Sequence, residues 1–167
     1  RQATNWVLYN NWEMTAFEVT GIPGTLAAEL KEGLALTGQW KLIKGRQRPP
    51  FSAELLAKDL ERIRLFLATR GYPGAVVVPS AVPESTSRQL ALTIAVTAGE
   101  PVRIAEVTFS GWPDGLAVPD TSDNRFLAVG QIVTDVKVSG GLEGMQNYLL
   151  NAGYAQVQVE MELLPRG

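Results

Sequence analysis

Apolar residues in the first hundred positions follow the periods of a strand, two helices and two more strands. Phe17 and Val19 alternate with polar residues in a segment that glycine and proline end at 21–24, which predicts a strand. Leucines at every fourth position, Leu26, Leu30 and Leu34, then predict a helix capped by Thr25 and ended by Gly38.

A second, longer helix is predicted from Ser52 onward, because the Ser52 hydroxyl can accept hydrogen bonds from the unpaired amides of a first helical turn. Its apolar row has the spacing of a helix face and consists of Leu56, Leu60, Ile63 and Leu67. Gly71 suits the left-handed residue that ends a helix, and Tyr72 can fold back on the last turn. The helix is therefore expected to end at a Gly-Tyr corner.

Two strands are predicted after this corner. Residues 76–82 are rich in β-branched side chains, and residues 90–96 alternate aliphatic with smaller or polar ones, as a half-buried strand does. The polar link at 83–88 suits a hairpin turn.

The same order of patterns restarts near residue 102. Residues 102–109 predict a strand in which either a bulge near Ala105 switches the buried face or the strand proper begins at Ala105. Residues 113–124 predict a loop. A short helix at 124–130 is expected before a longer one whose apolar row is Val138, Leu142, Met145 and Leu149. Three glycines cost this last helix about 1 kcal/mol each relative to alanine, so it needs support from packing.

Each apolar position of this last helix lies 82 residues after its counterpart in the helix that follows Ser52. Gly153, Tyr154, Val159 and Pro165 stand at the same offset from Gly71, Tyr72, Val77 and Pro83. A duplicated supersecondary unit explains this register. We therefore expect a leader at 1–13, one domain at 14–100 and a second at 101–167, whose last strand is expected past residue 167. Gly99, Glu100 and Pro101 form the predicted hinge.

Composition argues against several classes of protein. The 167 residues include no Cys and no His, carry a formal net charge of −2 and are 46% hydrophobic. A thiolate metal site and a histidine base are thus excluded, and no electrostatic reason to bind nucleic acid remains. Acid pairs such as Glu29 with Glu32, or Asp120 with Asp123, lack a nucleophile motif beside them. We expect no enzyme, no cofactor and no bound metal.

The segments "RGYPGAVVV" at 70–78 and "PVRIAEVTFSG" at 101–111, which ends at Gly111, resemble POTRA (polypeptide-transport-associated) domains. The resemblance implies an α+β fold of two β-α-α-β-β units, each with two helices on one face of a three-stranded mixed sheet, the second unit being truncated. It resembles most the outer-membrane assembly factors such as BamA and TamA. The chain departs from the family in its basic loop, its glycine-rich helix and its second unit.

Such domains stand in tandem in the periplasm ahead of a C-terminal membrane β-barrel, so the resemblance implies a partner-binding arm of an assembly or export factor. The implied partners are unfolded outer-membrane or exported proteins and accessory assembly proteins. Two alternatives stay open: a cell-division or envelope scaffold, and a two-partner-secretion transporter. Tandem units fit the assembly factors better than the division protein, which has one such domain.

The resemblance also implies that the strand after each Gly-Tyr corner lies at a sheet edge, where an extended client strand could pair with it. The implied binding residues come from both copies: Ala75, Val76, Val77, Val78, Ser80, Ala81, Gln156, Gln158, Glu160 and Glu162. Pro79 and Pro83 are four residues apart, so the N–H groups that they lack would point to the same side of the strand. That side must therefore face solvent. The prolines are therefore compatible with client pairing or with an edge protected against aggregation. In the second copy, an ordinary amphipathic strand is the alternative.

Two further groups of residues have an ordinary explanation beside a functional one. The basic loop contains Lys41, Lys44, Arg46 and Arg48, which could contact lipid phosphates or an acidic partner, or could simply be solvated. The four tryptophans could form a binding face or pack internally; they are Trp6, Trp12, Trp40 and Trp112.

Overall fold

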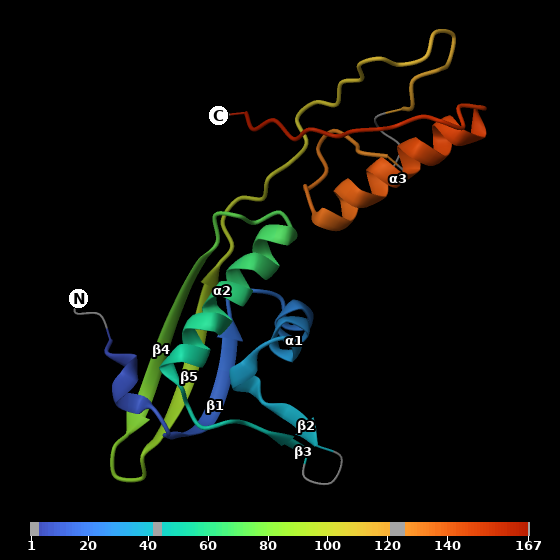
Figure 1. Ribbon diagram of the computed structural model, residues 1–167. Coiled ribbons are helices and arrows are strands. Elements are labelled where there is room, and N and C mark those ends of the chain that lie inside the picture. The colour runs from blue at the N-terminus through green and yellow to red at the C-terminus, as the bar shows by residue number, and fades with distance from the viewer. Residues whose placement is uncertain (1–3, 42–44, 121–125, 167) are drawn as a thin grey trace. The chain divides into compact units, whose positions relative to one another are not determined.

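The computed structural model describes residues 4–41, 45–120 and 126–166, and within these the side chains of 39–47 are left aside. The chain divides into two compact units. The first consists of Arg1–Ala68 and Tyr72–Glu100, and the second of Thr69–Gly71 and Pro101–Gly167 (Figure 1). That 14–100 and 101–167 are two POTRA-like domains remains a prediction.

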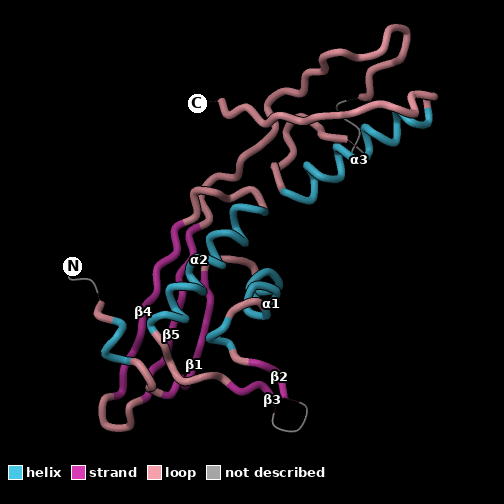
Figure 2. Tube along the Cα trace, in the orientation of Figure 1, coloured by secondary structure: helices cyan, strands magenta, loops and turns pink. Residues whose placement is uncertain are grey.

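The first unit is built on a three-stranded mixed sheet in the order β1-β5-β4 (Figure 2). β5 (Gln89–Thr97) lies in the middle, parallel to β1 (Glu13–Thr20) and antiparallel to β4 (Val76–Glu84). The inward row of β5 is almost fully buried and consists of Leu90, Leu92, Ile94 and Val96. This alternation is the one that the sequence predicts.

Two helices cover one face of this sheet, as Figure 1 shows. They are α1 (Gly24–Glu32) and α2 (Ala53–Thr69), and a 3-10 turn, η2 (Ala35–Thr37), lies between them. The core joins helix residues such as Leu30 and Ile63 to sheet residues such as Phe17. The predicted α+β fold, with the element order β-α-α-β-β, is confirmed for the first unit.

Local details of the first helix and strand differ from expectation. Thr25 is not the cap: α1 starts at Gly24 after Pro23 and has no side-chain capping bond. The helix ends at Glu32, where the Gly33 amide bonds back to the Leu30 and Lys31 carbonyls. Leu34 therefore lies outside the helix, although its side chain still packs in the core. β1 starts at Glu13, earlier than predicted, and a bulge between Met14 and Ala16 brings Met14 onto the buried face of Phe17.

Elements outside the predicted set extend the first unit. Residues 6–9 form a 3-10 turn, η1 (Trp6–Tyr9), and belong to the first unit. The basic segment is not a plain loop but a two-stranded antiparallel hairpin, β2 (Gln39–Lys41) with β3 (Gly45–Gln47). Ser52 accepts a bond from the Leu55 amide at 3.3 Å, as its predicted capping role requires.

Asp59 joins α2 to the turn that precedes it in the chain. Its carboxylate is fully buried, and its two oxygens accept the Ala35 and Leu36 amides at 2.8 Å each. Arg62, one turn along α2, donates to the same carboxylate at 2.8 Å. The amides at the start of η2 have no partner within that short turn, so Asp59 satisfies them and fixes the α1-to-α2 connection.

In the second unit, α3 (Asp135–Asn151) shares hydrogen bonds with α2 at both helix ends, at the offset of 82. The Thr134 hydroxyl accepts the Lys137 amide, as Ser52 does for Leu55. At the far end the Tyr154 amide bonds to Leu149 at 3.0 Å, as Tyr72 does to Leu67 at 2.9 Å. Both helices have 17 residues, so the duplication seen in the sequence extends to backbone geometry.

The start of the second unit repeats the first at a different offset. The Val133 amide donates to the Val102 carbonyl at 2.8 Å, and in the first unit the Phe51 amide donates to Trp12 at 2.8 Å. Both bonds tie the start of an extended segment to the residues just before a long helix. The glycine after this extended segment lies 50 residues before the Gly-Tyr corner in the first unit, from Gly21 to Gly71. In the second unit the same distance, from Gly111 to Gly153, is 42 residues.

Three expectations for the second unit are wrong for the described residues. Residues 102–110 and 155–163 form no strand, although Arg103 and Ile132 make one isolated antiparallel bridge. Residues 126–130 contain no helix, and 124–125 lie outside the described residues. The physical reason is that the connection before α3 is shorter than the one that contains α1, and that no β5-like strand among the described residues joins the two extended segments.

The predicted face switch near Ala105 does occur in the exposure pattern. Ile104 and Val107 are half-buried, and the two residues between them are both exposed.

The glycine-rich helix α3 has the packing support that it needs, because Gly141 is buried and a Cβ there would lie 2.7 Å from Leu127. A larger residue would push α3 away from this leucine.

We expect Asp59→Ala to lower the free energy of unfolding by about 2 to 4 kcal/mol, because it leaves two amides without acceptors. Urea denaturation followed by circular dichroism measures the change. Glu61→Ala is the matched control: it removes an exposed carboxylate on the same helix that pairs with Arg64, and should change stability by less than about 0.5 kcal/mol. Equal losses in both variants would contradict the role of Asp59.

Gly21→Ala and Gly111→Ala should differ strongly. Both glycines have positive φ, but a Cβ at Gly21 would lie 1.9 Å from the Val96 carbonyl oxygen, whereas one at Gly111 meets nothing within 4 Å. We expect a loss on the order of 3 kcal/mol or more at Gly21 and about 1 kcal/mol at Gly111. Thermal melts compare the two, and a milder effect at Gly21 than at Gly111 would be inconsistent with this packing.

Candidate functional site

The candidate site is the outer side of β4, the strand at one edge of the first unit's sheet. The backbone of β5 shows which β4 residues face outward. The Leu90 carbonyl accepts the Thr15 hydroxyl, and the Val96 carbonyl lies against Gly21. Even-numbered residues of β5 therefore turn toward β1, and odd-numbered ones bond to β4.

This parity decides the chemistry of the free edge. The partners of the even-numbered β5 residues are Val77, Pro79, Ala81 and Pro83, which accordingly point their backbone groups away from the sheet. All four offer a carbonyl, but the prolines have no N–H, so within this set Val77 and Ala81 supply the donors. The edge thus has more hydrogen-bond acceptors than donors. The sequence indicates this feature only once the pairing register of β4 with β5 is known.

The side chains of β4 alternate between the helix-covered face and the open face of the sheet. Val77 is buried, whereas Val76, Val78 and Val82 are 56%, 53% and 74% exposed. Ser80 is exposed and Ala75 and Ala81 are half-buried. An added strand beside β4 would find aliphatic neighbours on the open face.

The opposite edge of the sheet differs, because part of β1 is covered. The Phe51 amide donates to the Trp12 carbonyl just before β1 begins, and the Asn11 amide donates back to Phe51, both at 2.8 Å. Arg48 reaches the Thr15 carbonyl at 3.1 Å. Among the described residues, no backbone bond of this kind reaches the outward groups of β4, so β4 is the more open edge.

In the second unit, the predicted edge residues lie in a segment that runs back along α3 as loop (Figure 2). Gln156, Gln158, Glu160 and Glu162 are exposed, and the intervening Val157, Val159 and Met161 are half-buried. The alternation is that of a strand, although the segment is not paired with another one. The two sets of predicted binding residues are thus not equivalent.

The predicted structural and hinge residues occupy turns. Gly71 and Gly153 have φ of +94° and +100°, so both Gly-Tyr corners use the left-handed conformation. A Cβ at Gly71 would lie 2.3 Å from Ile132 within the second unit. Gly99 also has positive φ, at +75°, next to the Glu100–Pro101 boundary of the units. A hinge at this boundary remains a prediction.

The tryptophans that the structure describes pack against other rings. Trp6 lies 6.1 Å from Phe51 and Trp12 lies 5.1 Å from Tyr9, between ring centroids. Trp112 stacks on Tyr148 at 6.0 Å. For these three the ordinary reading holds. The side chains of Trp40, Lys41, Lys44 and Arg46 lie outside the described residues, and Arg48 bonds to β1.

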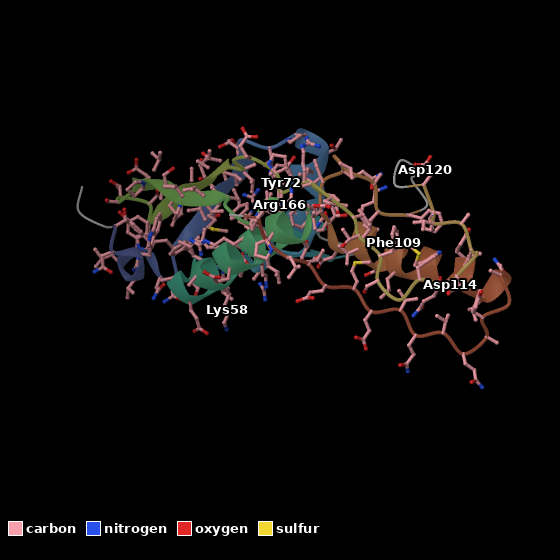
Figure 3. The ribbon with its side chains drawn as sticks, turned by 90° about the horizontal axis from the view of Figure 1, so that it is seen from above. Lys58, Tyr72, Phe109, Asp114, Asp120 and Arg166 are labelled. Atoms are coloured by element: carbon pink, nitrogen blue, oxygen red, sulfur yellow. The ribbon has the colours of Figure 1, made fainter. Side chains whose placement is uncertain are left out.

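Apart from the buried Asp59, charged groups of the first unit form ordinary surface pairs. On the outer side of α2, Lys58 donates to Glu54 at 2.8 Å, and this hydrogen bond and charge lower the pKa of Glu54 (Figure 3). No group of three or more acidic, histidine or cysteine side chains that could hold a metal occurs in the described parts of the chain. None of the described helices is long and apolar enough to span a membrane.

Comparison with known proteins gives solved structures only. No protein-family model and no curated protein matches the chain. POTRA4 of Haemophilus influenzae BamA is 23% identical, with 55% of this chain and 97% of that one covered and a TM-score of 0.42. POTRA3-5 of the same BamA is 19% identical, covering 82% and 50%, with a TM-score of 0.44.

A third match is BamA from Haemophilus ducreyi lacking POTRA domains 1-3, at 20% identity and a TM-score of 0.45, covering 83% of this chain and 24% of that chain. At these identities and scores the likeness concerns the fold, and nothing about activity follows from it. All three matches are POTRA domains of BamA, so the chain is similar to members of the family that its sequence resembles.

Proposed function

We propose that this chain is a partner-binding arm of an outer-membrane protein assembly or export factor, and that it binds extended client strands along the outer side of β4. The observation that carries the proposal is the outward row Val77, Pro79, Ala81 and Pro83, whose backbone groups are turned away from β5. An extended segment that pairs there becomes a fourth strand of the sheet. No reaction is involved, so the arm acts by recognition.

The edge suggests the chemistry of its client. A strand beside β4 would place alternate side chains next to the exposed Val76, Val78 and Val82 on the open face. Aliphatic or aromatic side chains at every second position would bury these valines. This pattern is the one expected of the strands of a membrane β-barrel, which alternate apolar with polar residues.

The proposal places the arm in the periplasm and its partners among unfolded outer-membrane or exported proteins and their accessory factors. Support comes from the fold, the free edge and the family resemblance of the sequence. Residues 155–163 would be a second pairing segment of the same arm. They alternate half-buried and exposed side chains as β4 does, and none of them is a proline.

Edge protection is the competing explanation, and it rests on the same prolines. A strand edge that lacks two of its outward donors pairs poorly with any neighbour, including a second copy of the chain. The two explanations differ in what happens when a donor is restored. Under client recognition the client gains affinity; under edge protection the chain self-associates.

The test is a pair of substitutions with opposite effects on outward donors. Pro79→Ala adds one N–H to the free edge, and Ala81→Pro removes one. One hydrogen bond changes an equilibrium about two- to tenfold, so Pro79→Ala should bind a peptide from the last strand of an outer-membrane barrel more tightly by that factor, and Ala81→Pro more weakly. Isothermal titration calorimetry measures both, and NMR shifts of Val76–Glu84 locate the peptide.

Two results would contradict client recognition along β4. One is a peptide that causes no shifts in Val76–Glu84; the other is unchanged affinity in both variants. Sedimentation of the free Pro79→Ala variant addresses the alternative directly. A dimer that forms without any gain in client affinity would establish edge protection instead.

A further inference from the structure

We propose that the open face of the first unit's sheet is a second interface, which binds an amphipathic helix of a partner protein through aliphatic and basic side chains. This face lies opposite the one that α1 and α2 cover (Figure 1). The proposal goes beyond client binding along β4, because a strand bound there widens the sheet, whereas a helix lies over its surface.

The pairing register shows which side chains share the open face. β5 contributes small residues, Ala91, Thr93 and Ala95, and their partners on β4 are Val82, Ser80 and Val78. The middle strand thus has no large side chain on this face, so a row of helix side chains can approach the β5 backbone closely. The valines of β4 stand along one side of this approach.

The open face is more apolar than a solvent-facing sheet surface usually is. An antiparallel pair with one face in water normally places polar side chains on that face. Here Val76, Val78 and Val82 are each more than half exposed, and the open face of β5 carries no charged residue. Contiguous aliphatic residues of this kind mark an interaction surface, because they leave water when a partner covers them.

The backbone of the sheet requires that the partner be a helix. β5 is paired on both sides, so a partner lying over it receives no backbone hydrogen bonds from it. Such a partner has to satisfy its own amides and carbonyls, and a helix does this within a single segment. Helices on both faces of a sheet are an ordinary layered arrangement.

Carboxylates give the open face its charge. Glu13 and Glu84 both stand opposite Gln89, and Glu18 stands opposite Thr93, so all three lie on this face. They are exposed, and Glu13 accepts a hydrogen bond from the Gln89 amide group at 2.8 Å. Within the described part of the chain, no ion pair neutralises any of them.

Two arginines that are described near these strands leave this charge in place. Arg48 donates to the Thr15 carbonyl, and Arg88 belongs to the turn between β4 and β5; neither forms an ion pair with the three carboxylates. A basic partner therefore complements the face, whereas a second copy of this chain would bring two sets of carboxylates together.

The positions of the apolar and acidic residues fix the orientation of the helix. Val78 and Val82 lie on the β4 side of β5, and Glu13 and Glu18 lie on the β1 side. A helix along β5 therefore turns its aliphatic row toward β4 and its lysines or arginines toward β1. Glu84 adds a carboxylate at the hairpin end of β4.

The experiment titrates a synthetic helix of about 18 residues, with leucines on one face and lysines along its flank, into the isotope-labelled chain. We expect NMR shift changes at Val78, Ala91 and Thr93. A peptide with glutamate in place of every lysine should bind about tenfold or more weakly. The amides of Val77 and Ala81 should keep exchanging rapidly, because the outer side of β4 stays free.

Matched variants of the chain test the two kinds of contact. Val78→Asp and Glu18→Lys should each weaken binding of the lysine peptide by about tenfold or more. The controls make the same changes on α2: Leu65→Asp at a residue that is 66% exposed, and Glu61→Lys at an exposed carboxylate. Both controls should leave the affinity within about twofold. If Val78→Asp unfolds the first unit, Glu18→Lys and the glutamate peptide still decide.

Ala81→Pro separates this interface from strand pairing. It removes a donor from the outer side of β4 and leaves the open face unaltered, so the lysine peptide should bind within about twofold of its original affinity. Weaker binding of a barrel-strand peptide to the same variant would concern β4 alone. Slowed exchange of Val77 and Ala81 on adding the lysine peptide would place it at the edge and overturn this inference.

Three further results would contradict the proposal. Equal losses in Glu18→Lys and Glu61→Lys would reduce the binding to general attraction by an acidic chain. Equal affinity for the lysine and glutamate peptides would remove the argument from charge. A dimer of the free chain that Val78→Asp abolishes in sedimentation would assign the open face to a second copy.

Discussion

The central position of β5 is the constraint on which the first unit depends. Its inward row, from Leu90 to Val96, is at most 5% exposed and lies against both helices. Because β5 pairs with β1 on one side and β4 on the other, β4 is left at an edge with half of its backbone groups turned outward. The candidate site is thus a consequence of how the core is built, and the prolines of β4 are tolerated because their missing donors fall on that side.

The two units apply this arrangement to different extents. Their long helices have the same length, begin with the same side-chain capping bond and end with the same backbone bond at a left-handed glycine. They differ where β5 would lie, and there the apolar residues of the second unit are half-buried instead of buried. A local sequence repeat can therefore fix helices and turns, whose bonds are local, while a sheet needs a partner that is distant in the chain.

The elements that the sequence predicted well are those whose signals are local. The apolar row of α2, the Gly-Tyr corners and the alternation of β5 all appear where expected, and so does the edge position of β4 that the family resemblance implied. Asp59 escaped prediction because a buried carboxylate on a helix looks, in sequence, like any exposed one; only the Ala35 and Leu36 amides, far away in the chain, give it a role. The strands of the second unit were predicted wrongly, since alternation indicates a side-chain pattern but cannot supply the neighbouring strand.

Native-state amide hydrogen exchange along β4 tests the central claim most directly. If even-numbered residues bond to β5 and odd-numbered residues face outward, then Val76, Val78, Ser80 and Val82 should exchange slowly, whereas Val77 and Ala81 should exchange rapidly despite lying in the same strand. Protection of Val77 and Ala81 equal to that of their neighbours would show that the outer side of β4 is already paired, and would contradict the free edge on which the account depends.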